Sequence, residues 1–373
     1  MRKLTIVIAL EIVFILGCIE PYEPHIADYE NLLVIDAMIT NQEGPYTIRL
    51  NRSYSYDGNH SQNVRNAVIT VRDNHDNEYN FREIYGGLYQ NSDSSFRGKI
   101  GYSYMIHIET ETGEIYESDF EELKEPIPID SIYYQYEPVQ ETSLKGIQIY
   151  LNTHDPENET WYYAWTYKET WEFAAPLVSY KYPQTCFRDN SSLEFIIGSS
   201  IKNNKDELKR QPVYYVDYNS DRLRIKYSTL LQQYSLTEEN YLYLSELKRI
   251  NESGGTLYDA PPTSLSGNVF NINNPKEAVL GLFQVSGVSE KRLFIDNESL
   301  PDKGVIPKMP QDCDVIYILA SDTIAIAEEI SNGYFIAGYL GDGESAQVEL
   351  INQYRCIDCR ESGTAVKPDF WED

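Results

Sequence analysis

The sequence lacks the short motifs that mark the common kinds of catalytic site. Its five histidines do not form a His-Glu-x-x-His metal site, and the chain has no Gly-x-Ser-x-Gly turn, no phosphate-binding loop and no dinucleotide-binding glycine motif. A pair of catalytic carboxylates cannot be recognised among 58 acidic residues. We therefore expect a protein that is not an enzyme and that uses no cofactor.

Basic residues are also scarce. Lys and Arg number 31 against 58 Asp and Glu, which gives a formal net charge of −27. A surface this acidic repels phosphate backbones, so nucleic acid is excluded as a partner. The apolar content of 42% and the charged content of 24% are typical of a folded globular protein, and the length of 373 residues allows about two domains.

Long apolar runs are missing after the N-terminus. The chain opens with two basic residues and a mostly apolar stretch over residues 4–17, which is too short to span a bilayer. This stretch ends in Ile15-Leu16-Gly17-Cys18, which resembles a bacterial lipobox. We predict a lipoprotein signal peptide over residues 1–17 and a lipidated Cys18. Glu11 interrupts the apolar run, and an ordinary signal peptide followed by an incidental cysteine is the alternative.

Residues 18–30 carry two prolines and several acidic residues, which is typical of a stiff, solvated tether. Acidic residues directly after a lipidated cysteine resemble the surface-export signals of Bacteroidota lipoproteins. A plain acidic spacer is an equally good interpretation.

Four further cysteines lie at Cys186, Cys313, Cys356 and Cys359. In an exported chain they predict two disulfides, for which three connectivities are open. Cys356 and Cys359 could also form half of a zinc site or a redox motif, but the sequence offers neither a second close pair nor a thioredoxin-like setting. Acidic groups at 73–78 and 155–159 lack the calcium-loop spacing of an EF-hand. We therefore expect structural disulfides, solvated acidic turns and no metal site.

From residue 31 onward, short alternating runs of apolar and polar residues are separated by turn residues. Tyr46, Ile48 and Leu50 share one face of such a run, and residues 102–108 repeat the pattern. About seven such runs over residues 31–123 predict an Ig-like or prealbumin-like β-sandwich. Residues 124–130 are rich in proline and predict a stiff linker between domains.

Beyond the linker, alternation returns and predicts a larger β-rich domain over residues 131–373. One helix is expected near residues 236–252, because Ser235-Leu236-Thr237-Glu238 matches a capping box, apolar residues follow at helical spacing and Gly254-Gly255 ends the run. We expect this helix to pack on a sheet and a second, short helix at 324–330. The predicted fold class is mainly β: an Ig-like or prealbumin-like sandwich, then a β-rich domain with one or two helices.

Tyrosine is unusually abundant, with 32 of 373 residues. Trp161, Tyr163 and Trp165 occupy alternate positions and so share one face of a predicted strand, and Trp171 continues the same register. In one interpretation this face is the core of the second domain. In the other, Trp161, Trp165 and Trp171 form an exposed platform that binds sugars or peptides. Abundant tyrosine favours binding over catalysis, because it provides contact area at low entropic cost.

An ordered set of short segments, spread over the chain after Cys18, resembles a known family. The segments are Leu33-Val34-Ile35-Asp36, Pro126-Ile127-Pro128-Ile129-Asp130-Ser131, Thr170-Trp171-Glu172-Phe173, Tyr227-Ser228, Gln233-Tyr234-Ser235-Leu236, Ser253-Gly254-Gly255-Thr256-Leu257-Tyr258-Asp259, Gly267-Asn268, Leu280-Gly281 and Lys367-Pro368-Asp369-Phe370-Trp371. Together with the cysteines, they resemble the Bacteroidota lipoproteins grouped as domain of unknown function 4249. The resemblance implies an outer-membrane lipoprotein, often encoded beside TonB-dependent receptors. It carries over roles only for Cys18 and the later cysteines.

We therefore expect a lipoprotein anchored in the outer membrane that acts as an accessory or substrate-capture component of a TonB-dependent nutrient transporter. A glycan or a peptide is the expected ligand, and the cell surface is favoured over the periplasmic face. The transporter link follows from the resemblance alone. The alternatives are a cell-surface adhesin or assembly lipoprotein with protein partners, and a surface glycan or peptide hydrolase.

Overall fold

The computed structural model describes residues 31–53, 62–93, 95–137, 145–179, 181–193, 195–218, 220–253, 267–301 and 313–372. The predicted signal peptide, Cys18 and the acidic tether lie outside the described residues. Strands dominate the described part, which contains two α-helices, so the predicted mainly β fold class is confirmed. Within the same part, no helix is both long enough and apolar enough to cross a membrane.

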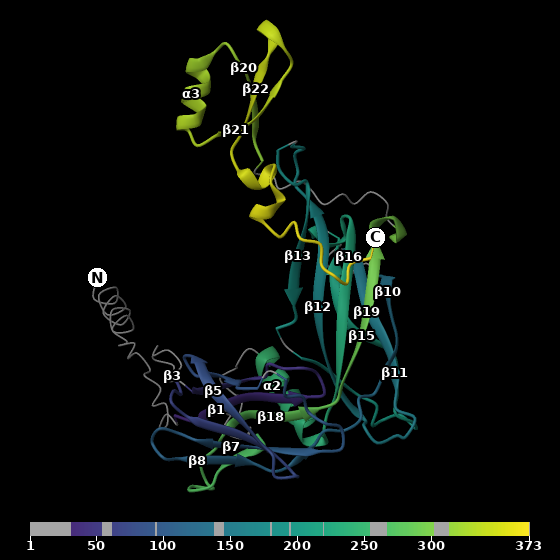
Figure 1. Cartoon of the computed structure of the whole chain (residues 1–373). Coiled ribbons are helices and arrows are strands. Elements are labelled where there is room, and N and C mark those ends of the chain that lie inside the picture. Colours follow the sequence, from purple (N-terminus) through teal and green to yellow (C-terminus); the bar gives the residue numbers. More distant parts are fainter. Residues whose placement is uncertain are drawn as a thin grey trace, which may run out of the picture.

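The first domain is built on one sheet of eleven strands, at the lower left in Figure 1. Its strands are β1 (Leu33–Thr40), β2 (Thr47–Arg52), β3 (Gln62–Asn63), β4 (Val68–Asp73), β5 (Glu78–Tyr85), β6 (Leu88–Asn91), β7 (Ser103–Glu109), β8 (Ile115–Ser118), β9 (Glu121–Glu122), β17 (Val269–Asn271) and β18 (Leu280–Ser286). Their order is β17-β8-β7-β4-β5-β6-β2-β1-β18, with β3 on β2 and β9 on β7. All the pairings are antiparallel except that of β1 with β18, which is parallel.

Alternation along the strands builds the core of this domain. Leu33, Ile35 and Ile39 of β1 point inward and are buried with Phe283 and Val285 of β18. The expected domain at 31–123 contains β1 to β9, but β17 and β18 complete the same sheet from residues 267–286. Alternation predicts where a strand lies but does not indicate with which distant strand it pairs. The expected domain boundary therefore separates β17 and β18 from the sheet to which they belong.

The second domain is a sandwich of two sheets, upright in Figure 1. The three-stranded sheet contains β10 (Ile129–Tyr136), β11 (Gly146–His154) and β15 (Glu207–Asp217), and the other contains β13 (Thr185–Ser191), β12 (Tyr162–Ala174), β16 (Lys226–Ser235) and β19 (Val288–Asp296), with β14 (Ile196–Ser199) also on β12. Buried side chains from both sheets form one core, among them Leu151, Trp165, Val216 and Leu231. Between β15 and β16 lies a short 3-10 helix, η1 (Asp221–Leu223), and after β19 lies η3 (Asn297–Ser299).

The chain passes between the two domains three times. It does so through the linker around Pro126, from β16 through α2 to β17, and directly from β18 into β19 through Gly287. A Cβ atom at Gly287 would lie 2.4 Å from the Lys124 carbonyl oxygen and 2.8 Å from the Pro126 nitrogen. The linker and the Gly287 passage are therefore packed against each other, backbone to backbone.

Helix α2 (Glu238–Ser253) follows β16 and contacts β12 and β14, which confirms that the predicted helix packs on a sheet. The predicted capping box is wrong in its first residue, because Ser235 is the last residue of β16 and pairs there with Tyr163. The cap is Thr237, whose Oγ1 accepts a hydrogen bond from the Asn240 backbone N–H at 3.2 Å.

The C-terminal module, residues 313–351, lies at the top of Figure 1, beyond the sandwich. It contains β20 (Val315–Leu319), α3 (Thr323–Ser331), β21 (Phe335–Leu340), η4 (Gly343–Ser345) and β22 (Gln347–Ile351), in the sheet order β20-β22-β21. Helix α3 corresponds to the short helix expected at 324–330. After the module, η5 (Tyr354–Cys356) and η6 (Cys359–Glu361) lead the chain back to the sandwich, where Thr364 bridges Phe187.

Candidate functional site

An apolar groove of about 580 Å³ lies between α2 and the outer face of the β1–β18 pair. Three structural elements line it: this strand pair, α2, and the region of β14 in the sandwich. The groove is therefore built at the junction of the two domains, a common position for ligand sites.

The floor of the groove is a second apolar face of the first sheet. Val34 and Met38 of β1 point away from the core, on the side opposite Ile35. In the parallel register, Val34 lies beside Leu280 and Met38 beside Gln284, and Leu282 lies between them on β18. Strands that are apolar on both faces are typical of parallel pairs covered on both sides.

Helix α2 forms the wall. Leu244, Leu247 and Ile250 recur at a spacing of three residues and line the groove. Tyr243 fixes the helix to the floor, because its Oη accepts a hydrogen bond from the Gly281 backbone N–H at 2.7 Å. Gly281 has φ of +94°, and a Cβ atom there would lie 1.7 Å from the Ile35 carbonyl oxygen, so only glycine allows this approach of β18 to β1.

The sandwich completes the groove with Phe195 and Ile196, and the fully exposed Leu193 stands at its rim. Asp36 and Lys248 are the charged residues among those that line it. This composition suits a ligand with apolar side groups and one or two polar or charged groups that set its orientation.

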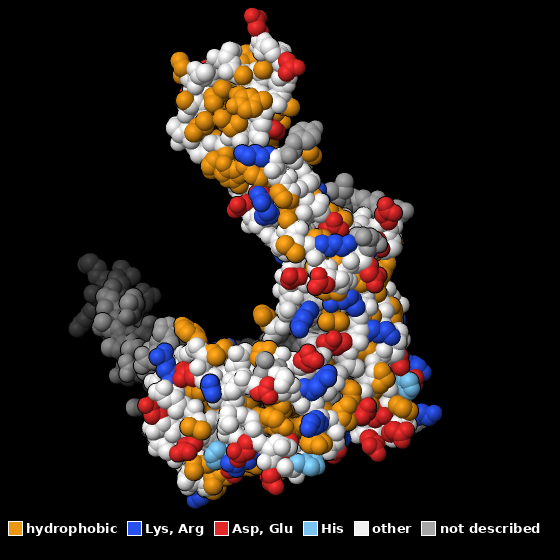
Figure 2. Space-filling model, viewed as in Figure 1, with side chains coloured by type: hydrophobic (Ala, Val, Ile, Leu, Met, Phe, Trp, Pro, Cys, Tyr) orange, Lys and Arg blue, Asp and Glu red, His pale blue; other side chains and the backbone are white. Residues whose placement is uncertain are grey.

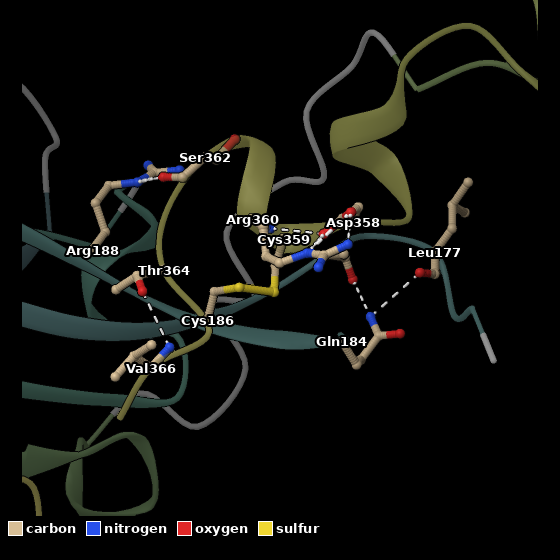
Figure 3. Close-up of a disulfide and its surroundings, with 11 residues drawn as sticks. Leu177, Gln184, Cys186, Arg188, Asp358, Cys359, Arg360, Ser362, Thr364 and Val366 are labelled. Carbon is tan, nitrogen blue, oxygen red and sulfur yellow. Dashed lines mark hydrogen bonds and ion pairs between the residues drawn. A yellow bond between two sulfur atoms is a disulfide. The ribbon is translucent and has the colours of Figure 1, made fainter. Parts of the chain in front are cut away.

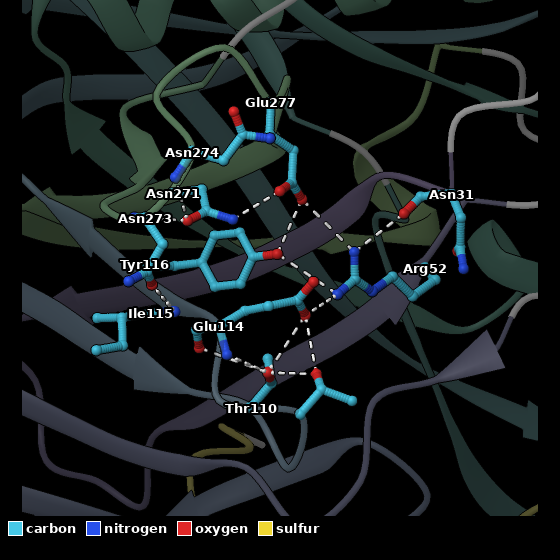
Figure 4. Close-up of polar contacts among 11 residues, drawn as sticks. Asn31, Arg52, Thr110, Glu114, Ile115, Tyr116, Asn271, Asn273, Asn274 and Glu277 are labelled. Carbon is cyan, nitrogen blue, oxygen red and sulfur yellow. Dashed lines mark hydrogen bonds and ion pairs between the residues drawn. The ribbon is translucent and has the colours of Figure 1, made fainter.

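A second pocket, polar and about 880 Å³ in volume, opens beside Asn31, where the described chain begins. Arg52 lines this pocket, and Figure 4 shows its contacts with Glu114, Glu277 and Asn31. The Arg52 guanidinium lies 2.6 Å from the Glu114 carboxylate and 3.6 Å from that of Glu277, and its Nη1 donates to the Asn31 carbonyl oxygen at 3.0 Å.

Tyr116 extends this network into the core. Its Oη donates to Glu277 Oε1 at 2.8 Å, and Asn271 Nδ2 donates to Glu277 Oε2 at 2.6 Å. Burial, and then the hydrogen bond to Glu277, raise the pKa of Tyr116 well above its usual range, so the phenol stays protonated. The network joins β2, β8 and the segment between β17 and β18. It donates one hydrogen bond to the backbone at Asn31, directly after the predicted tether.

The predicted aromatic site is not assembled. Trp165 is fully buried and its Nε1 donates to Gln233 Oε1 at 2.8 Å, while Trp171 is buried and its ring contacts the guanidinium groups of Arg188 and Arg222. For these two residues the exposed-platform interpretation is wrong and the core interpretation is right. Trp161 is half-buried, precedes β12 with φ of +58°, and does not continue the face of the strand.

The four cysteines form two disulfides, as predicted, and the structure resolves their connectivity. Cys186 pairs with Cys359, and Cys313 pairs with Cys356. Figure 3 shows the first bond joining β13 to the segment after the C-terminal module, where Arg188 Nε also donates to the Ser362 carbonyl oxygen at 2.8 Å. Among the residues that the structure describes, no group of three or more His, Cys, Asp or Glu side chains could hold a metal ion.

The acidic side chains in the two predicted turns accept hydrogen bonds from the backbone. The Asp155 carboxylate accepts hydrogen bonds from the backbone N–H groups of Glu157, Glu159 and Thr160 at 2.9 to 3.0 Å. Burial alone would raise its pKa, but these three donors outweigh burial and lower it. Asp73 accepts from the backbone of His75 and Asn77 in the same manner. Both carboxylates therefore stabilise turns.

Sequence reasoning did not identify the groove, although part of its signal was present. The sequence contains two continuous, mostly apolar runs, Leu33-Val34-Ile35 and Val279 to Phe283, which lie in β1 and, from Leu280 onward, in β18. Runs without alternation indicate strands that are covered on both faces, which is the condition for an apolar floor outside the core. The pairing of the two runs, and hence the groove, had no signal in the sequence.

The model of the family described as "Domain of unknown function (DUF4249)" matches residues 19–292. The match includes every strand that forms the floor of the groove and ends within β19, before the C-terminal module. No curated protein matches the chain.

Proposed function

The chain belongs to the DUF4249 family, and from this premise we propose that it is a lipoprotein, anchored in the outer membrane, that captures a ligand as an accessory component of a TonB-dependent nutrient transporter. The observation that carries the proposal is the apolar groove between α2 and the β1–β18 pair. Its volume of about 580 Å³ lies within the usual range of small-molecule sites, roughly 300 to 1,000 Å³.

The lining of the groove favours one of the two expected ligand classes. A glycan presents many hydroxyl groups, each of which loses free energy when it is buried without a hydrogen-bond partner. The walls of Leu244, Leu247 and Phe195 offer apolar contact instead. The preferred ligand is therefore a peptide segment with apolar side chains, whose polar end lies near Asp36 or Lys248.

The predicted anchor supports the transporter role. If Cys18 carries lipid, residues 18–30 form a tether that spans at most about 45 Å when fully extended. The Arg52 network holds the chain where the tether ends, so the first domain stays close to the membrane in which a transporter barrel lies. An anchored binding domain raises the local concentration of ligand at the transporter.

Ligand capture can be tested with two fluorescent probes, the neutral dye Nile red and a fluorescein-labelled hexapeptide of alternating Leu and Ser. Both should bind saturably, and the peptide should displace the dye. Leu247→Glu and Leu282→Glu place a carboxylate in the groove and should weaken binding at least tenfold. Leu242→Glu, on an exposed part of the same helix outside the groove, is the matched control and should bind as the wild type does. Absence of saturable binding, or equal losses in the control, would refute capture in the groove.

The transporter link needs a separate experiment. The lipidated protein is purified from detergent-solubilised outer membranes under mild conditions, and its companions are identified by mass spectrometry. Stoichiometric recovery of a TonB-dependent receptor supports the proposal. A partnerless lipoprotein contradicts it, and recovery of other surface proteins in place of a receptor favours the adhesin or assembly role.

A further inference from the structure

We propose that the C-terminal module, residues 313–351, docks onto a partner protein whose surface combines apolar side chains with lysine and arginine. The proposal goes beyond ligand capture and does not depend on it, because the module shares no residue with the groove. It depends on four features of the module, which are its open sheet face, an aromatic extension of that face, its charge and its attachment to the sandwich.

The sheet of the module leaves one face open. In the register of β20, β22 and β21, Val348 and Leu350 lie on one face and are buried. The opposite face, which we call the open face, includes four large apolar side chains that are between 38% and 50% exposed, whereas Ile351 at its end is buried. The four are Tyr317, Leu319, Phe335 and Leu340. On the Val348 face, Ile336 and Tyr339 of the edge strand β21 are also exposed.

The open face continues beyond the sheet. The half-exposed Tyr354 lies against Phe335 with ring centroids 4.4 Å apart, and Tyr182 of the sandwich lies edge-on to Tyr354 at 6.3 Å. Figure 2 shows hydrophobic side chains gathered over the module on the side in view. Contiguous apolar surface of this kind marks interaction sites in soluble domains, whereas single exposed apolar residues do not.

The charge of the module selects the partner. Residues 313–351 contain seven Asp and Glu and no Lys, Arg or His. Glu349 lies on the open face itself, within hydrogen-bond distance of the Tyr317 hydroxyl at 3.3 Å. The negative electrostatic potential of the module repels anionic lipid headgroups. It also repels a second copy of this chain, whose net charge is −27. A surface that combines apolar side chains with Lys or Arg is the complementary one.

The attachment of the module suits a docking role. The Cys313–Cys356 disulfide closes the module at its base, and three residues later Cys359 is bonded to Cys186 of β13. The Leu177 backbone N–H also donates to the Cys356 carbonyl oxygen at 2.8 Å. A partner bound to the open face is therefore held by a module whose base is joined to the sandwich by a disulfide.

Site-specific photocrosslinking in the native outer membrane tests the proposal. Benzoylphenylalanine replaces Tyr317 on the open face, or Tyr85, which is 82% exposed in the first domain and serves as the matched aromatic control. We expect one protein adduct from position 317 and none from position 85. The crosslinked partner peptide should lie in an apolar surface flanked by Lys or Arg. No adduct, the same adduct from both positions, or a crosslink to lipid or to a second copy would overturn the proposal.

A defined probe tests the charge selection on the purified full-length protein. The probe is an amphipathic helical peptide of Leu and Lys, compared with its counterpart in which Glu replaces every Lys. The basic peptide should bind at least tenfold more tightly than the acidic one, and its affinity should fall as salt rises. Phe335→Ser combined with Leu340→Ser should abolish the difference, whereas Tyr85→Ser should retain it. Equal binding of the two peptides, or an unchanged preference in the double variant, would contradict the proposal; circular dichroism confirms that each variant is folded.

Discussion

The side-chain amide of Asn41 bonds both backbone polar groups of Val288. The Val288 N–H donates to Asn41 Oδ1 at 2.7 Å, and Asn41 Nδ2 donates to the Val288 carbonyl oxygen at 3.2 Å. Asn41 follows β1 in the first domain, and Val288 begins β19 in the second. The amide therefore takes the role of a neighbouring strand at the point where the chain passes from one domain to the other.

Asn41→Ala should destabilise the protein by about 1 to 3 kcal/mol, because both backbone groups of Val288 lose their partner at a site that is only partly open to water. Urea unfolding at pH 7 measures the loss. The adjacent Gln42→Ala removes an exposed hydrogen bond to Glu290 and a long one from Gln232, and it should cost less than about 1 kcal/mol. If the two substitutions cost the same, the Asn41 amide has no special role at the junction.

Glu121 should make the stability of the protein depend on pH. Its carboxylate accepts hydrogen bonds from Asn268 Nδ2, Asn240 Nδ2 and the Val285 backbone N–H. Burial is the largest effect and raises its pKa, with a smaller contribution of the same sign from Glu239, while the three donors lower it. The folded protein therefore binds this proton more tightly than the unfolded chain does, so its contribution to stability falls as pH rises from about 4.3 through the folded pKa.

Glu121→Gln removes this proton equilibrium. The free energy of unfolding of the wild type, minus that of Glu121→Gln, should decrease as pH rises from about 4 to 7, and subtraction removes the titration of the other acidic groups. Glu122→Gln, the exposed neighbour on β9, gives the baseline for the loss of one negative charge. A difference that stays level or increases with pH would contradict the assigned sign.

Gly281→Ala should disrupt the floor of the groove. Alanine there adopts a left-handed φ of +94° and places a Cβ atom 1.7 Å from the Ile35 carbonyl oxygen, so β18 has to move away from β1. Gly113 provides a control, since its φ is +83° but a Cβ atom would meet nothing within 4 Å. Gly113→Ala should cost about 1 to 2 kcal/mol, which is the conformational penalty alone. Thermal unfolding should show a clearly larger loss for Gly281→Ala, and equal losses would mean that the sheet accommodates the methyl group.

The two disulfides should contribute differently. Cys186 and Cys359 are 173 residues apart, and replacing both with Ser should cost about 2 to 5 kcal/mol of global stability. Cys313 and Cys356 close only the module, so replacing that pair should expose residues 313–356 to proteases while the sandwich stays intact. Limited proteolysis with mass spectrometry separates the outcomes. Simultaneous cleavage of module and sandwich would show that the two are not separate units of stability.

Local features of the fold were predictable because burial follows the period of the strand. Ile48 and Leu50 alternate in the sequence and are buried on one face of β2, as expected. The disulfides were predictable from the number of cysteines and the predicted export of the chain, but the connectivity was not, because loops of any length close at a similar entropic cost.

The predictions of a capping box at Ser235 and of an aromatic platform were wrong for a shared physical reason. Ser235 can cap a helix or lie in a strand, and Trp165 and Trp171 can pack in a core or lie on the surface. Tertiary contacts decide between these roles. Ser235 remains in β16 because its backbone is paired with Tyr163, and Trp165 is accommodated in the core because Gln233 satisfies its Nε1. The groove was hidden because it depends on which strands meet across the chain.

The parallel pairing of β1 with β18 also constrains the order of events when the protein folds. Val34 of β1 pairs with Leu280 of β18, so the first strand of the domain cannot complete its pairing until a segment about 250 residues later in the chain is present. Until that segment has been synthesised, β1 presents a bare, apolar edge of the kind that pairs with other chains. Contacts this distant in sequence form slowly. The first domain in sequence is thus among the last to be completed, and a chain that ends before Ser286 has neither a finished sheet nor a groove.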